Sequence, residues 1–94
     1  MTTLWTCTPP GRFLIREWDG ESVIFDLFSN DTHACDRLAT ALIRELSDGP
    51  STAARISQVL TAVADWGDHA NFAATTRATL EDLERLGVIE RVEP

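Results

Sequence analysis

The dipeptide Asp19-Gly20 separates two runs of alternating apolar and polar residues, and it constrains the fold more than any other feature of the sequence. A two-residue turn of this kind needs positive φ angles, which aspartate and glycine tolerate, and it joins antiparallel strands. A β-hairpin over residues 12 to 28 is therefore predicted. Its register pairs four sets of residues across the two strands: Trp18 with Glu21, Arg16 with Val23, Leu14 with Phe25, and Ile15 with Ile24.

A second turn, at Ser29-Asn30, returns the chain into a short third strand at about residues 32 to 35. The three strands then form an antiparallel meander in chain order. In this arrangement His33 lies across from Asp26, which predicts an ion pair between neighbouring strands.

The apolar residues after this meander recur at helical spacing. Asp36 is placed to cap a first helix, which Asp48-Gly49-Pro50 ends, and Ser51 or Thr52 can cap a second helix that ends near Trp66-Gly67. The expected buried stripes of these two helices are Cys35, Leu38, Ala39, Leu42 and Leu46, and then Ile56, Val59, Leu60 and Val63.

A third helix is predicted from about residue 71 to residue 86, closed by Gly87. Glu81 and Arg85 are expected to form an ion pair on its exposed side. Residues 88 to 92 alternate again and predict a last short strand. The expected buried line of the helix is Phe72, Thr76, Leu80 and Leu83.

Together these elements predict one α+β domain of winged-helix-like architecture, with a three-stranded meander, three helices and a C-terminal strand. A chain of 94 residues has room for a single core, so residues 1–94 are expected to form one domain. Residues 1–11, which include Pro9-Pro10-Gly11, are expected to be loosely held.

The charge of the chain bears on its partners. Fifteen carboxylates stand against eight arginines and no lysine, which gives a net charge of −7 and repels nucleic acid and anionic membranes. No secretory signal is present, so we expect a cytoplasmic protein in which Cys7 and Cys35 are free thiols.

The sequence predicts neither a metal site nor a catalytic one. Cys7, Cys35, His33 and His69 lack the close C-x-x-C spacing that anchors structural zinc, and Cys35 falls on a helical core stripe. No serine or cysteine is singled out beside a histidine and a carboxylate, and no phosphate-binding glycine loop is present. We expect no cofactor and no enzymatic activity.

A winged helix can bind DNA through its third helix. In this chain the expected third helix carries Arg77 and Arg85 against Glu81, Asp82 and Glu84, whereas helices that read DNA carry clustered positive charge. Binding of nucleic acid is therefore the less favoured alternative.

From about Phe13 to Val92 the order of these elements resembles the PqqD-like family, the small peptide chaperones of pyrroloquinoline quinone biosynthesis. Four motifs look like one subgroup, the chaperone of the HPr-kinase-related A system: Trp18-Asp19-Gly20-Glu21, Asp31-Thr32-His33, the helix-opening Asp36, and residues 80 to 89 (Leu-Glu-Asp-Leu-Glu-Arg-Leu-Gly-Val-Ile). The chain departs from many relatives in having Cys35-Asp36 where a Leu-Asn pair is common.

The resemblance implies a recognition element that binds the leader of a ribosomally made precursor peptide by strand addition and presents it to a modifying enzyme or an HPr-kinase-related protein. An exposed strand edge binds a peptide without catalytic residues, and it also makes a homodimer plausible. The alternatives are a DNA-binding regulator and a structural adaptor or dimerisation domain. The peptide-binding residues that the resemblance implies at the strand edge are Thr32, His33, Ala34 and Cys35. Thr75, Thr79 and Leu86 are placed on one flank of the third helix by projection from its expected buried line, and we expect them to line the peptide site.

Overall fold

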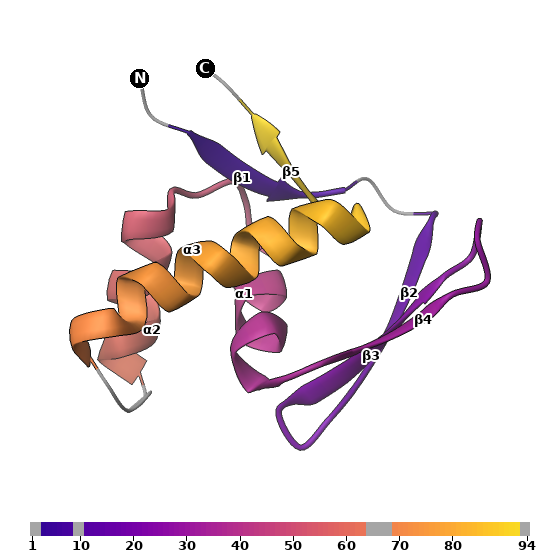
Figure 1. Cartoon of the computed structure of the whole chain (residues 1–94), viewed down its shortest axis with the longest axis horizontal. Coiled ribbons are helices and arrows are strands. Elements are labelled where there is room, and N and C mark those ends of the chain that lie inside the picture. The colour runs from indigo at the N-terminus through magenta and orange to yellow at the C-terminus, as the bar shows by residue number, and fades with distance from the viewer. Residues whose placement is uncertain (1–2, 9–10, 64–68, 93–94) are drawn as a thin grey trace.

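A computed structural model of the chain describes residues 3–8, 11–63 and 69–92, and it confirms the α+β architecture (Figure 1). A three-stranded antiparallel meander is followed by three helices and a C-terminal strand, and one further strand precedes the meander. The elements are β1 (Leu4–Cys7), β2 (Phe13–Trp18), β3 (Glu21–Asp26), β4 (Thr32–Cys35), α1 (Arg37–Ser47), α2 (Ala53–Val63), α3 (His69–Leu86) and β5 (Ile89–Val92).

The hairpin of β2 and β3 has the predicted turn and the predicted register. Asp19 and Gly20 have φ angles of 56° and 80°, as a two-residue hairpin turn requires. Trp18 faces Glu21 across the strands, and the pairing continues without a bulge to Phe13. Strand β4 then pairs with β3, so the sheet order is β2-β3-β4.

The predicted ion pair between His33 and Asp26 is wrong. Asp26 already pairs with Asp31, whose carbonyl accepts the Asp26 N–H at 2.8 Å, and this places His33 opposite Ile24. The turn between β3 and β4 therefore spans residues 27 to 30, which is longer than the two-residue turn predicted at Ser29-Asn30. The carboxylate of Asp26 instead binds Arg12 at 3.0 Å.

The expectation that residues 1–11 are loosely held is wrong for β1. This strand pairs antiparallel with β5, and Trp5 is only 2% exposed. Trp5 and Ser51 also exchange two backbone hydrogen bonds, of 2.8 and 3.0 Å. The buried Trp5 indole and the pairing with β5 therefore hold this segment in place. Residues 1–2 and 9–10 lie outside the described part of the chain.

The helix caps form as predicted. The Asp36 carboxylate accepts the Ala39 N–H at 2.9 Å, and α1 ends before Asp48. At α2, the Thr52 hydroxyl accepts the Arg55 N–H at 3.1 Å. The predicted end of α2 near residues 66 and 67, and the side chain of Val63, lie outside the described residues.

The core lies between the meander, the three helices and the β1–β5 sheet. The predicted line of α3 is buried, and in α1 Leu38 is only half-buried while Ile43 is buried in addition. No helix within residues 3–8, 11–63 and 69–92 has both the length and the apolar character that a membrane crossing requires. The buried apolar residues are Trp5, Ile24, Cys35, Ala39, Leu42, Ile43, Leu46, Ile56, Leu60, Phe72, Leu80, Leu83, Val88 and Ile89.

The predicted ion pair between Glu81 and Arg85 is wrong as well. Arg85 binds Asp82 at 2.7 Å, one residue closer along the helix. Glu81 lies 4.0 Å from Arg91, which is part of β5 and lies 2.9 Å from Glu84. A cation from the neighbouring strand thus replaces the one expected from the same helix.

Candidate functional site

Strand β4 is an edge strand of the meander, and its register determines which backbone groups are free. Hydrogen-bonded and non-hydrogen-bonded pairs alternate along an antiparallel ladder. Since Asp26 and Asp31 form a hydrogen-bonded pair, His33 also bonds to β3 and the pairs on either side of it do not. The N–H and C=O groups of Thr32 and Ala34 therefore point away from β3, toward the open edge.

The side chains of β4 alternate between the two faces of the sheet. Those of His33 and Cys35 turn toward the core, where Cys35 is buried and His33 half-buried, and those of Thr32 and Ala34 are exposed. Burial raises the pKa of the Cys35 thiol, which favours the protonated form and a packing role. Two of the four predicted strand residues thus present free backbone groups, and the other two anchor the strand.

The three predicted residues of α3 share one flank of the helix. Thr75 is exposed, Thr79 is half-buried and donates its hydroxyl proton to the Thr75 carbonyl at 2.9 Å, and Leu86 is half-buried against the core. By the helical period of 3.6 residues, Glu84 lies on the opposite side of the buried line. Glu84 binds Arg91 of β5, so the flank with Thr75 faces away from β5.

Helix α1 contacts both β4 and α3, the two elements that carry the predicted site residues. Strand β4 packs on β3 and α1, while α3 packs on α1, α2 and β5. In Figure 1, β1 and β5 lie along one side of α3 and the meander lies on the other side, near its C-terminal end. Within the described part of the chain, no hydrogen bond or ion pair joins the strand residues directly to the helix residues.

Sequence reasoning missed the cluster that fixes the turn leading into β4. The Asp26 carboxylate accepts bonds from Arg12 at 3.0 and 3.3 Å, from the Phe28 N–H at 3.0 Å and from the Ser29 N–H at 3.3 Å. The bond from Arg12, aided by the two N–H groups, holds the pKa of this carboxyl well below its usual range. An aspartate at a strand end followed by a turn is the signal that could have indicated this cluster.

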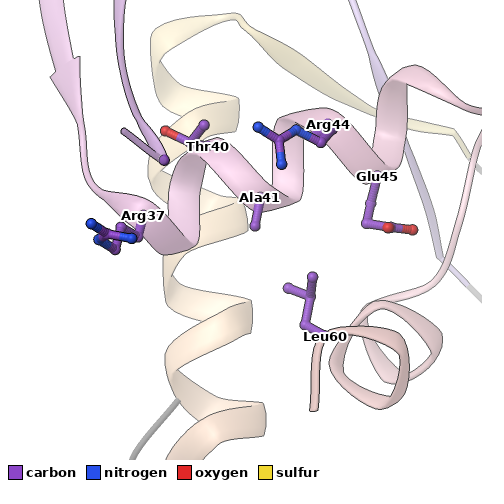
Figure 2. A pocket seen from close by; sticks show the side chains of 7 residues that line it. Arg37, Thr40, Ala41, Arg44, Glu45 and Leu60 are labelled. Atoms are coloured by element: carbon purple, nitrogen blue, oxygen red, sulfur yellow. The ribbon is translucent and has the colours of Figure 1, made fainter. Parts of the chain in front are cut away.

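A hollow of about 260 Å³ lies between the hairpin tip, α1 and α2 (Figure 2). Two of its polar side chains are engaged within the chain: Arg44 pairs with Glu17, and the Thr40 hydroxyl donates to the Asp36 carbonyl at 2.8 Å. The lining offers no nucleophile with a base beside it. It consists of Gly20, Arg37, Thr40, Ala41, Arg44, Glu45 and Leu60.

The cysteines and histidines do not assemble into a metal centre in the described ranges, where no three potential ligands come together. Both cysteines are free thiols. Cys7 is half-buried, with its Sγ 3.6 Å from the Ile43 carbonyl oxygen, and burial raises its pKa. The side chain of His69 lies outside the description.

No family model matches the chain, and neither does any curated protein sequence. Two solved structures share its fold. TbiB1 in complex with the TbiA(beta) leader peptide superposes with a TM-score of 0.73 at 16% identity, over 95% of this chain and 99% of that one. Lasso peptide synthetase B1 complexed with the leader peptide superposes with a TM-score of 0.71 at 19% identity, over 92% and 96% of the two chains. The likeness confirms the fold along nearly the whole chain.

Proposed function

We propose that this chain is a non-catalytic peptide chaperone that binds the leader segment of a ribosomally synthesised precursor peptide and presents it to a modifying enzyme. The observation that carries the proposal is the open edge of β4, where Thr32 and Ala34 direct their backbone N–H and C=O groups away from β3. Two further proteins support it, because both share this fold and both were solved with a leader peptide.

The leader binds as an added strand. Main-chain hydrogen bonds to Thr32 and Ala34 supply affinity that depends little on leader sequence, and alternate leader side chains supply specificity. His33 and Cys35 keep β4 in register through their bonds to β3 and their position toward the core. The leader side chains that turn toward the helices meet the flank of α3 formed by Thr75, Thr79 and Leu86.

The charges of α3 support a peptide partner over DNA. Arg85 is paired with Asp82, and Arg91 beside the helix is paired with Glu84. The clustered positive charge that reads a phosphate backbone is therefore missing from this part of the surface. Tight and salt-sensitive binding of a DNA duplex in an anisotropy assay would contradict the proposal.

The proposal is tested by replacing Ala34 with proline. This substitution removes an N–H from the open edge without removing a bond to β3, and edge strands tolerate proline. We expect the affinity for a labelled synthetic leader peptide, measured by fluorescence anisotropy, to fall at least about tenfold, the effect of about 1.4 kcal/mol.

Ala34→Ser is the matched control, because it retains the backbone N–H at the same exposed position. We expect its affinity for the leader to stay close to that of the unchanged protein. Leu86→Glu, which places a charge on the proposed helix flank, should weaken binding while circular dichroism shows a folded protein. Unchanged leader binding in Ala34→Pro would contradict the proposal.

A further inference from the structure

The meander exposes large apolar side chains on the face that turns away from the helices. By alternation, this outer face carries Leu14, Arg16 and Trp18 of β2, and Glu21, Val23 and Phe25 of β3 with Leu27 beyond it. Thr32 and Ala34 of β4 lie on the same face. Trp18 is 59% exposed, Leu27 55%, Leu14 43% and Phe25 36%. The largest apolar patch on a typical monomer covers about 300 to 600 Å² and often has a function, so this face is a candidate interaction surface.

The size of the outer face fits a protein interface. With the areas typical of these side chains, the four apolar residues expose roughly 400 Å². A standard interface buries about 800 Å² on each partner, and somewhat more than half of that is apolar. The outer face therefore supplies about the apolar area that one side of a stable dimer needs.

The shape of the outer face points to a second copy of the same chain as the partner. At one end lies a hollow of about 370 Å³, lined by Leu14, Arg16, Phe25, Asp26, Leu27, Asn30 and Asp31. At the other end the Trp18 indole projects into solvent. Trp18 and Leu14 are four residues apart on β2, about 13 Å, so the face carries both a projection and a hollow.

The outer face also carries charges of opposite sign, Arg16 and Glu21, which can pair between two copies of the chain. Arg16 lines the hollow and has no ion pair or hydrogen bond among the described residues. Glu21 is the cross-strand partner of Trp18 and stands beside the projecting indole. A two-fold axis that runs parallel to the plane of the sheet and across its strands turns the two outer faces toward each other and brings Trp18 of one copy into the hollow of the other. Glu21 and the indole of one copy then lie near Arg16 of the other, and a guanidinium binds the face of an indole.

We propose that two copies of this chain form a symmetric dimer through their outer faces, with Trp18 of each copy in the hollow of the other. The sheets pack face to face, about 10 Å apart. The open edge of β4 lies in the plane of the sheet and stays free, so the dimer is independent of the proposed peptide function.

Sedimentation velocity of the full chain from about 1 to 200 µM tests the dimer. We expect dimers at the upper end of this range. Trp18→Ala removes the projection and Leu27→Asp places a charge in the hollow, and each should weaken the dimer at least about tenfold. Both positions are exposed, so we expect circular dichroism and thermal melting to show folded variants.

Val92→Ser is the control, because Val92 is 39% exposed on β5 and lies outside the outer face. Its dimer affinity should equal that of the unchanged chain. A monomer at every concentration would overturn the proposal. A dimer that persists in both Trp18→Ala and Leu27→Asp, or that is lost in Ala34→Pro alone, would also overturn it, because the copies would then pair elsewhere.

Discussion

The two sheets of this domain differ in how much of their surface the chain covers. In the β1–β5 sheet, Trp5 is buried, bonds to Ser51 beyond the strand pair, and lies under the Arg91 guanidinium, whose carbon is 4.7 Å from the ring centre. In the meander, one face of β3 and β4 packs on α1, while the other face and the edge of β4 stay open. The comparison separates a sheet that stabilises the fold from one that is available to partners.

The inner face of the meander shows why an open sheet remains ordered. Ser22, Ile24 and Cys35 point into the core and are 7% exposed or less. The Ser22 hydroxyl lies 2.8 Å from that of Thr40 in α1, which ties β3 to the helix. The covered face fixes the register, and the other face stays exposed.

The largest expected effect is the loss of Trp5. Trp5→Ala should lower the free energy of unfolding by about 3 to 5 kcal/mol, because it removes a buried indole and leaves a cavity. Trp18→Ala, in the open sheet, should change it by no more than about 0.5 kcal/mol in monomeric samples. Urea unfolding followed by circular dichroism measures both, and similar losses for the two tryptophans would break the comparison.

A smaller effect is expected at Asp26, which connects the open sheet to its turn. The pKa of this carboxyl is lowered in the folded state, so its contribution to stability is present above the unfolded pKa of about 3.9 and is lost as the pH falls through the folded pKa. Asp26→Asn should therefore lower the melting temperature at pH 7, and the difference should shrink in strong acid.

Asp31→Asn is the control for this pH series, because it removes a carboxylate from the same turn at an exposed position. We expect a smaller loss of stability at pH 7 for this variant. A difference between Asp26→Asn and the unchanged protein that stays constant down to pH 2 would contradict the role of the charged carboxylate.

The smallest of these effects is expected at the junction of the open sheet with α1. Asp36→Ala removes the side chain that accepts the Ala39 N–H and should cost about 1 kcal/mol. Asp36→Ser retains a capping oxygen and should cost less. Urea unfolding of the two variants checks the difference, and equal stabilities would show that the cap does not hold this junction.

Local signals made much of the fold predictable. The Asp19-Gly20 turn set the hairpin register, Asp36 marked the start of α1, and the buried line of α3 followed from its period. These features depend on neighbours within a few residues, so the sequence carries them directly.

The errors arose where distant segments meet. Strand β1 is four residues long and its partner lies at the other end of the chain, so no turn signals their pairing. Arg91 reaches α3 from β5 and takes the place of a partner expected within the helix. His33 was misplaced because the length of the turn before β4 depends on the Asp26 cluster.

The candidate site was predictable only in part, because some of it depends on contacts between segments that are distant in the sequence. The sequence indicated β4 as an edge, and the resemblance suggested its residues. Which of them present free backbone groups depends on the register with β3, which only the structure provides.

The most direct test of the open edge is an amide NMR titration of the protein with a synthetic leader peptide. We predict the largest shifts, and slower hydrogen exchange, at Thr32 and Ala34, with smaller changes at His33, whose N–H already bonds to β3, and along the Thr75 flank of α3. Changes centred on residues 16 to 21, with residues 31 to 35 and α3 unaffected, would contradict the account.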